Sequence, residues 1–400
     1  MSHLEVCPSA LNSDRFEMVA LGSIVVERAE RASLMELPAL SVGKLGVTAQ
    51  LEGVAKQNSE VLRKVVRKGD LVINSRADRK GAAGLSLYEG SVSPVYSVMI
   101  PKAELLSAKY GHYLLRSVAF QEEFFRWGTG IVSDLWSTNF TRMARIRVPL
   151  PPLTIQNSIA SYLDRETGEI DAMLAKLASL SESVSERRRE IVRSLLKAVG
   201  QTVRLGLVVD VVSGSGFPDR FQGISDEELP FYKVSSLSNV DRQVLTDSEN
   251  TVSREIADQL GARIIPSQSV VMAKIGAALL LARYALTSRP SCIDNNMQAL
   301  VPHQGVIVSR FLAYAMEDVS ISSLVKPGPV PSLDVMGMKM SRIAFSPSIK
   351  EQCRIADRLD EVTGRIDAML ATIDELKALL VERRAALITD VVTGRKKVPA

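Results

Sequence analysis

Two stretches of the chain carry hydrophobic side chains at alternating steps of three and four residues. In the first stretch these positions are Ile159, Leu163, Ile170, Met173, Leu177, Leu180, Val184 and Ile191. In the second they are Ile355, Leu359, Val362, Ile366, Met369, Ile373, Leu376, Leu380 and Leu387. Such stepping predicts an amphipathic helix whose hydrophobic seam packs as in a coiled coil. Prolines stand just ahead of each stretch, as expected at the start of a helix: Pro149, Pro151, Pro152 and Pro347.

The two stretches are copies of one another. Residues 156–188 read QNSIASYLDRETGEIDAMLAKLASLSESVSERR, and residues 352–384 read QCRIADRLDEVTGRIDAMLATIDELKALLVERR. The offset is 196 residues, and 17 of the 33 aligned positions are identical. The chain is therefore a tandem duplication in which each half ends in the same helical segment. As a helix of about 40 residues, each would be on the order of 60 Å long. A seam of that length has to be buried, so we expect the two helices to pair as an antiparallel coiled coil.

Two repeated features depart from the seam pattern. Arg187 and Arg383 occupy the same predicted seam position, where an apolar residue would be expected. Each guanidinium could reach solvent or a neighbouring glutamate, or it could mark the register or contact a partner subunit or DNA phosphate. We predict a subunit interface at these two residues. Gly168 and Gly364 also match in mid-helix, where glycine costs roughly 1 kcal/mol relative to alanine, and they predict a bend or a close approach of another backbone.

The segments between the helices predict two globular domains. Residues 17–148 and 201–346 contain short apolar runs interrupted by Gly, Pro, Asn and Ser, which is typical of mixed α/β domains. Only faint parallels relate these two segments, whereas the helices are nearly the same. We therefore predict an α+β fold with a pseudo-twofold tandem repeat, in which two long helices separate two mixed α/β domains. The expected parts are an N-terminal arm (1–16), a first globular domain (17–150), a central helix (151–200), a second globular domain (201–346), a C-terminal helix (347–392) and a tail (393–400).

Composition and charge narrow the classes of function. Hydrophobic residues make up 46% of the chain, enough for sizeable cores, and the net charge of +4 fits a nucleic-acid partner without requiring one. Three scattered cysteines and three isolated histidines offer neither a disulfide framework nor metal-ligand spacing. The N-terminus lacks the apolar segment of a signal peptide, and charged residues interrupt the most apolar stretch, 270–286. We expect a soluble, cytoplasmic protein without a metal site.

Motifs for catalysis are absent from the sequence. There is no G-x-x-x-x-G-K-[ST] phosphate loop and no Asn/Asp-Pro-Pro-aromatic tetrapeptide of the methyltransferase type. The glycine pairs at 128–130 and 214–216 lack the strand-to-helix context of a cofactor loop, and we interpret both as turns. We therefore predict a non-catalytic binding protein.

The order of globular domain, helix, globular domain, helix resembles the specificity subunits of type I restriction-modification systems. The resemblance covers almost the whole chain. Its strongest elements are the phrase at the start of each helix, PLPPLTIQ at 149–156 and more loosely SPSIKEQ at 346–352, with the I-A-x-x-L-D and E-R-R segments that follow. The phrase GSVSPVY at 90–96 is similar to one found in many target-recognition domains of the family. The second globular domain has DNNMQ at 294–298 instead, so its contacts cannot be copied from the first.

The resemblance implies a division of labour between subunits. Each globular domain would be a target-recognition domain that reads one half of a bipartite double-stranded DNA target, and the paired helices would fix the gap between the halves. The helices would also dock two methyltransferase subunits, which methylate adenine with S-adenosylmethionine. Two motor-nuclease subunits, which use ATP and Mg, would join for restriction. No cofactor is expected in this chain, and no membrane partner.

DNA reading needs guanidinium, ammonium or amide groups on exposed loops. In the first domain the candidates are Arg76, Arg79, Lys80, Asn139 and Arg142. In the second they are Lys233, Asn239, Arg242, Lys274, Asn295, Asn296 and Gln298. Each basic residue could equally be a solvated surface charge, and Asn295 and Asn296 could equally shape a turn. We expect Trp127 and Trp136 to belong to the core.

Two alternatives to this function remain open. The chain could be a coiled-coil scaffold whose globular domains bind protein, in which case DNA association would be absent or insensitive to salt. It could also be the specificity subunit of another restriction class with similar domains. A fused restriction-methylation enzyme would need a cofactor motif that the sequence lacks.

Overall fold

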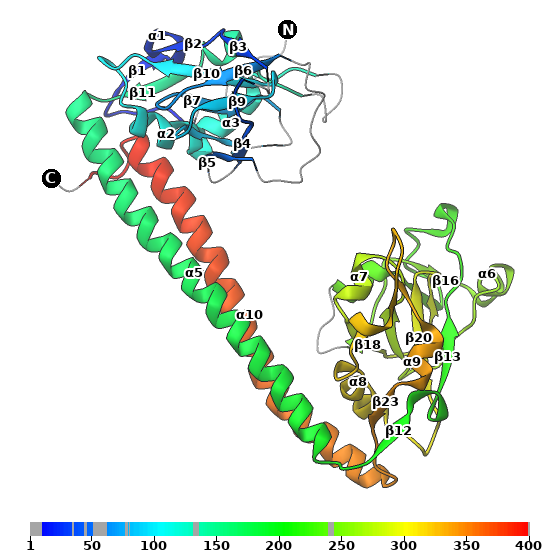
Figure 1. The fold of residues 1–400 in the computed structure, drawn as a ribbon. Coiled ribbons are helices and arrows are strands. Elements are labelled where there is room, and N and C mark those ends of the chain that lie inside the picture. Colours follow the sequence, from blue (N-terminus) through cyan, green and yellow to red (C-terminus); the bar gives the residue numbers. More distant parts are fainter. Residues whose placement is uncertain are drawn as a thin grey trace. The chain divides into compact units, whose positions relative to one another are not determined.

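The computed structural model describes residues 10–33, 36–43, 46–50, 62–76, 79, 81–130, 136–238 and 244–398. The chain divides into two compact units, one made of Met1–Leu177 with Glu375–Ala400 and the other of Ala178–Asp374. Two long helices, α5 (Leu153–Lys197) and α10 (Ile349–Val392), each contribute one part to either unit (Figure 1). Each unit therefore holds one globular head, the beginning of one long helix and the end of the other. We call the globular parts head 1 and head 2.

Head 1 is built on antiparallel sheets that begin and end beside each other. Strand β1 (Glu17–Ala20) pairs with β11 (Arg147–Leu150), which brings the first and last strands of the head together. A four-stranded sheet has the order β2-β10-β7-β8, formed by Val25–Glu27, Tyr96–Pro101, Leu71–Asn74 and Ala83–Leu85. The smaller sheets are β3-β6-β9 (Arg31–Ala32, Arg63–Val66, Gly90–Val92) and β4-β5 (Leu40–Gly43, Gly46–Ala49). The helices are α1 (Leu21–Ile24), α2 (Ala108–Arg116), α3 (Val118–Arg126) and α4 (Phe140–Met143).

Head 2 repeats this plan with additions. Strand β12 (Thr202–Arg204) pairs with β23 (Arg342–Ala344), and the main sheet has the order β13-β20-β17-β18-β15, formed by Val209–Ser213, Met297–Pro302, Val270–Ala273, Tyr284–Thr287 and Val244–Leu245. The smaller sheets are β16-β14-β19 (Thr251–Val252, Leu229–Tyr232, Cys292–Ile293) and β21-β22 (Val325–Lys326, Ser332–Leu333). The helices are α6 (Arg254–Gln259), α7 (Ala277–Leu280), α8 (Ser309–Glu317) and α9 (Val335–Met340). The first four strands of the main sheet follow the same order of connection as those of head 1, although the two head sequences share little.

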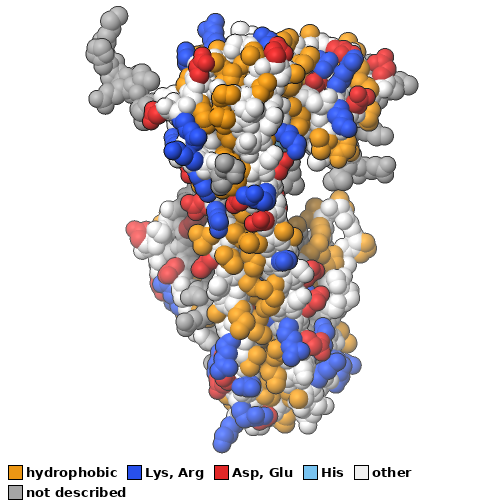
Figure 2. All heavy atoms as spheres, turned by 90° about the vertical axis from the view of Figure 1, so that its left-hand side faces the viewer, with side chains coloured by type: hydrophobic (Ala, Val, Ile, Leu, Met, Phe, Trp, Pro, Cys, Tyr) orange, Lys and Arg blue, Asp and Glu red, His pale blue; other side chains and the backbone are white. Residues whose placement is uncertain are grey.

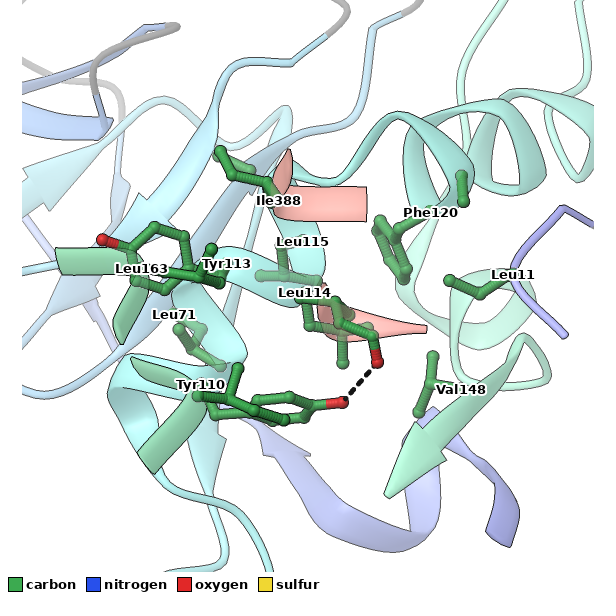
Figure 3. Packing of buried hydrophobic residues seen from close by; sticks show 14 of the residues in the cluster. Leu11, Leu71, Tyr110, Tyr113, Leu114, Leu115, Phe120, Val148, Leu163 and Ile388 are labelled. Carbon is green, nitrogen blue, oxygen red and sulfur yellow. Dashed lines mark hydrogen bonds between the residues drawn. The ribbon is translucent and has the colours of Figure 1, made fainter. Parts of the chain in front are cut away.

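The core of each unit joins a head to the long helices. In the first unit Tyr110, Leu114 and Phe120 of head 1 belong to one buried cluster with Leu163 of α5 and Ile388 of α10 (Figure 3). The Tyr110 hydroxyl donates to the carbonyl of Pro149 at 2.9 Å, and the Val392 carbonyl oxygen lies 3.4 Å from it. In the second unit the corresponding cluster combines head 2 with Val192 and Leu196 of α5 and with Ile355 and Leu359 of α10. In each unit, one hydrophobic cluster is thus shared by the head and the two long helices.

The two long helices run antiparallel, and a repeated ion pair marks their register. In the first unit Arg384 Nε lies 3.1 Å from Asp171 Oδ1. In the second unit Arg188 Nε lies 2.8 Å from Asp367 Oδ1. These four residues are the same two positions of the 196-residue repeat, used once in each direction. The predicted α+β fold, with two heads, two antiparallel helices and a pseudo-twofold repeat, is confirmed.

The predicted position of the seam is wrong by one residue in part of each helix. Met173, Leu180, Met369 and Leu376 were placed in the seam, but between 44% and 58% of each side chain is exposed. The helix faces inward one residue later, at Leu174, Ser181, Leu370 and Lys377, which are half-buried. For the same reason Arg187 and Arg383 are exposed, whereas Arg188 and Arg384 are half-buried in the seam. Unbroken three-and-four stepping from Leu163 passes through polar Thr167 and Ser181, whereas the prediction followed only the large apolar side chains.

Candidate nucleic-acid interface

A cleft of about 470 Å³ opens on head 1, and three separate segments of the chain line most of it. The segments contribute residues 75–76, 94–97, and 137 with 139–141, and Glu27 and Lys64 complete the lining. Backbone hydrogen bonds hold them together, because Ser75 N–H donates to the Val95 carbonyl at 3.3 Å and Thr138 N–H donates to the Ser75 carbonyl at 3.0 Å. The fold therefore brings Arg76, the Ser-Pro-Val-Tyr phrase and the stretch around Asn139 to one place.

The cations near this cleft differ in how far they are already neutralised. Lys64 Nζ lies 3.1 Å from Glu27 Oε1, so its charge is partly compensated. Arg76 is exposed, and its guanidinium makes no ion pair with another described residue. Arg142 is also exposed, near the end of α4. Arg76 and Arg142 are therefore the better candidates for phosphate or base contacts. Arg79 is exposed too, and Lys80 lies outside the described residues.

Asn139, Trp127 and Trp136 each make hydrogen bonds within head 1. Asn139 Oδ1 accepts a hydrogen bond from Arg142 N–H at 3.0 Å and so caps α4, while the amide nitrogen of that side chain stays available for DNA. Trp136 donates its indole N–H to the Phe125 carbonyl at 3.0 Å and stacks on the Phe125 ring with centroids 5.7 Å apart. Trp127 donates to Glu123 Oε1 at 3.1 Å and packs against the core of the head. Both tryptophans are therefore held in place by the head itself.

In head 2 the described candidates gather around the turn that follows β19. Asn296 N–H donates to Asp294 Oδ1 at 2.8 Å, and the Asn296 carbonyl accepts from Lys274 N–H at 2.8 Å. Burial raises the pKa of the Asp294 carboxyl, while the charges of Lys233 and Lys274 act in the opposite direction, so both lysines lie within electrostatic reach of it. Lys233 Nζ also donates to Gln222 Oε1 at 2.8 Å. Asn295 is exposed at the tip of the turn.

One predicted DNA contact of head 2 is wrong, and two cannot be placed. Gln298 is fully buried, and its Oε1 accepts from the Ser213 hydroxyl at 3.1 Å. It lies on β20, a strand with neighbours on both sides in the main sheet, and every residue of Met297–Leu300 is buried, so its side chain cannot reach a ligand from there. Asn239 and Arg242 lie outside the described residues.

Sequence reasoning gave no role to two glutamines that are identical in the repeat. Gln156 and Gln352 are each fully buried where a head meets the first turn of a long helix. Gln156 accepts from Ser107 N–H and donates to the carbonyls of Leu105 and Pro151, each at 2.8 Å. Gln352 makes the same three bonds, to Val308 N–H and to the carbonyls of Val306 and Ser346, at 2.7 to 2.9 Å. A polar residue repeated at the same place, three residues ahead of the seam residues Ile159 and Ile355, was the signal that could have singled them out.

Another repeated set of residues is exposed and has no contact that explains its composition. A Cβ atom added at Gly168 or Gly364 would meet nothing within 4 Å, so no described part of the chain approaches these glycines. Ala172 and Ala175 share the face of Gly168, as Ala368 and Ala371 share that of Gly364, and all are exposed. Met173 and Met369 lie next to them, 50% and 58% exposed. Figure 2 shows hydrophobic side chains exposed between clusters of lysine and arginine on one face of the molecule. We call these two sets, one in each unit, the small-residue faces.

The described residues offer neither a membrane-spanning helix nor a cluster of metal ligands. No helix among them is long and apolar enough to cross a membrane. In the same part of the chain, no group of three or more His, Cys, Asp or Glu side chains is placed so that it could hold a metal ion.

Comparison with known proteins points to one family. No family model matches the chain. The specificity subunit of the type I restriction enzyme EcoR124I/EcoR124II from Escherichia coli is 23% identical over 267 residues, which cover 63% of this chain and 62% of that subunit. A chain in a structure describing complex assembly and conformational transition of the type I restriction-modification system has a TM-score of 0.64 and 16% identity, covering 96% of this chain and 100% of the other. The HsdS subunit from Thermoanaerobacter tengcongensis aligns over 96% of this chain and 98% of its own, with 16% identity and a TM-score of 0.43. In sequence this chain resembles a specificity subunit of a type I restriction enzyme, and in fold it resembles a chain of a type I restriction-modification system.

Proposed function

We propose that this chain is the double-stranded DNA-binding specificity subunit of a type I restriction-modification complex, with no catalytic site of its own. It reads a bipartite target and directs adenine methylation and restriction by its partner subunits. The observation that carries the proposal is the duplicated plan of the molecule: two heads with the same strand order, each joined to one end of an antiparallel pair of repeated helices. One chain thus presents two separate readers, as a target in two halves requires.

Each head would use its own set of side chains on DNA. In head 1 the cleft with Arg76 and the exposed Arg142 offer guanidinium groups, which bind phosphate oxygens and the guanine edge. In head 2 the turn with Asn295, Lys233 and Lys274 offers amide and ammonium groups instead. The two sets differ in residue type, although Arg76 and Lys274 follow corresponding strands of the two main sheets, β7 and β17. The two half-sites should therefore differ in sequence, which gives an asymmetric target.

The long helices would serve two purposes. They connect the heads and so would set the number of unread base pairs between the half-sites. The small-residue faces would admit helices of two methyltransferase subunits, one in each unit, since small side chains allow helix axes to approach closely. Those subunits would bind S-adenosylmethionine, and two motor-nuclease subunits would bind ATP and Mg for restriction. The complex would act on DNA in the cytoplasm.

The test is to co-express the chain with the methyltransferase encoded beside it and to map methylated adenines across the host genome. We expect a split motif with two defined halves and a fixed gap, present only when this chain is present. Unaltered methylation despite a bound, active methyltransferase would overturn the proposal. The scaffold alternative would then be favoured, and DNA association that does not weaken with added salt would support it. A related restriction class would instead be recognised by the type of nuclease gene that accompanies the chain.

A further inference from the structure

Each head is fastened to a long helix by the same set of hydroxyl and carboxylate groups. In the first unit the Tyr113 hydroxyl of α2 donates to Asp164 Oδ1 at 2.7 Å and lies 3.3 Å from Thr167 Oγ1. In the second unit the Tyr314 hydroxyl of α8 donates to Asp360 Oδ1 at 2.8 Å and lies 2.9 Å from Thr363 Oγ1. Asp164, Thr167, Asp360 and Thr363 are identical pairs of the repeat, although α2 and α8 come from heads of different sequence. We call each such set, with its glutamine, a joint.

The polar atoms at the centre of a joint leave little freedom of movement. Both tyrosines are buried, at 4% and 5% exposed, and both threonines are buried as well. Thr167 Oγ1 and Thr363 Oγ1 donate to the carbonyls of Leu163 and Leu359 in their own helices, at 2.6 and 2.8 Å. Gln156 and Gln352 use their amide oxygen and both amide hydrogens on three backbone groups. Moving a head on its helix would leave several buried groups without partners at once, which is costly.

A cation on the head extends each joint toward solvent. Lys109 Nζ donates to Asp164 Oδ2 at 2.8 Å. Arg310 occupies the same place in head 2 and contacts two carboxylates, Asp360 and, at 2.7 Å, Asp357. These ion pairs are partly exposed and add less than the buried groups, but they hold the aspartates in the orientation that the tyrosines need.

We propose that the joints are positioning sites for target recognition: Tyr113, Asp164 and Thr167 in one unit, and Tyr314, Asp360 and Thr363 in the other, fix the angle of each head on its helix. They thereby decide which gap between half-sites the protein accepts. One base pair more or less displaces a half-site by about 3.4 Å along DNA and turns it by about 35°. A head held at a single angle rejects such a displaced half-site, whereas a loosened head can follow it. The inference rests on the proposed function and adds residues that do not touch DNA.

The experiment compares two variants that each lose buried hydrogen bonds in head 2. Tyr314→Phe with Asp360→Asn removes the hydroxyl–carboxylate contact of the joint and the charge of Asp360 that Arg310 contacts, and Tyr314→Phe alone removes the hydroxyl while the ring packing is kept. Tyr232→Phe is the matched control, because that buried hydroxyl donates to the Leu245 carbonyl inside the head at 3.2 Å, away from the helices. The full chain with its methyltransferase is given DNA with the native gap and DNA with the gap changed by one base pair. Circular dichroism first shows that each variant is folded. The quantity measured is then the methylation rate on DNA with the native gap divided by the rate on DNA with the changed gap.

We expect the ratio to fall at least tenfold in the double variant, less in Tyr314→Phe, and to stay at the wild-type value in Tyr232→Phe. A general loss of stability would lower both rates together and leave their ratio unchanged. Joint variants that keep the wild-type ratio, while wild type itself prefers one gap, would overturn the role of the joints alone. A wild-type chain that methylates without regard to the gap would contradict the proposed function instead.

Discussion

The arginine that repeats in the helix seam, Arg188 in the second unit and Arg384 in the first, should contribute more to the free energy of unfolding at Arg188 than at Arg384. Arg188 lies between two carboxylates, with Nη1 2.7 Å from Glu317 Oε2 and Nε 2.8 Å from Asp367 Oδ1. Its side chain is 14% exposed and that of Glu317 is 18% exposed, whereas half of Asp367 is in solvent. Arg188→Met keeps the aliphatic packing but leaves Glu317 buried without this cation.

The size of the stability loss in Arg188→Met follows from how deeply Arg188 and Glu317 are buried. Breaking a fully buried pair by removing one partner costs about 3–5 kcal/mol, and an exposed pair contributes about 0–1 kcal/mol. Because this pair is mostly but not fully buried, we expect Arg188→Met to lower the free energy of unfolding by about 2–3 kcal/mol. In a unit of this size that corresponds to a fall in Tm of roughly 4–12 °C.

The same substitution at the repeat-related Arg384 is the matched control. Arg384 faces Asp171, which is half exposed, and the helix end that carries Glu317 in head 2 carries Arg116 in head 1. Burial lowers the pKa of Arg116, and the positive charge of Arg384 lowers it further, so the two arginines repel each other. Arg384→Met removes the weak attraction to Asp171 together with the repulsion from Arg116. We therefore expect the free energy of unfolding to fall by less than about 1 kcal/mol.

Thermal and urea unfolding of the full-length variants measure both changes, and a cycle with Glu317→Gln isolates the contribution of the Arg188–Glu317 pair. Equal losses for Arg188→Met and Arg384→Met would refute the reasoning. So would an Arg188→Met effect that persists unchanged when Glu317 is already glutamine.

Three further predictions concern head 1 and the first unit. Burial chiefly, and then the charge of Arg116, lowers the pKa of His112 from 6.5 to about 4. Because the unfolded state therefore binds a proton at a higher pH than the folded state, the free energy of unfolding should fall by about 3 kcal/mol from pH 6.5 to pH 4. A His112→Gln variant with the same pH dependence of urea unfolding would contradict this. Arg76→Ala should weaken binding to the cognate duplex by roughly 1–3 kcal/mol in a fluorescence anisotropy titration, and Lys64→Ala by less because Glu27 already compensates Lys64; the reverse order would remove Arg76 from the interface. Gly168→Leu should leave the chain at least as stable, since a Cβ there meets nothing, yet weaken association with the methyltransferase in calorimetric titration; undiminished association would exclude this face as the docking site.

The architecture was predictable because the duplication is preserved in the sequences of the two helices. Identical residues at a 196-residue offset indicate two equivalent helices and two heads without any knowledge of the heads themselves. The position of the seam was not predictable to one residue, because Ser181 and Lys377 stand where the pattern would need apolar side chains and Leu180 and Leu376 lie beside them. Only the partner helix, with its ion pairs at Asp171 and Asp367, decides between the two alternatives.

The candidate site was predictable in outline but not residue by residue. The loop at Arg76 and the stretch around Asn139 were singled out separately, and only backbone pairing through Ser75 and Thr138 places them at one cleft. Gln298 was predicted to contact DNA because it lies close to two asparagines of a turn, but it is the second residue of β20, and that part of the strand is buried. The joints escaped notice because their tyrosines lie in heads that share almost no sequence, so only one half of each contact carries the signal of the repeat.

The two compact units also differ in how soon they can be completed during synthesis. The second unit is one continuous piece, Ala178–Asp374, whereas the first has its core closed by Leu387, Ile388 and Val391 near the other end of the chain. At about 5–20 residues per second, the ribosome needs roughly 10–40 s to make the intervening residues after head 1 has emerged. Head 1 is therefore synthesised first, but its core is completed last. Until α10 is made, the apolar surface that α10 covers stays exposed. A chain cut short within the last turns of α10 would release a head 1 whose core is open, and such a product is a natural substrate for chaperones and proteases.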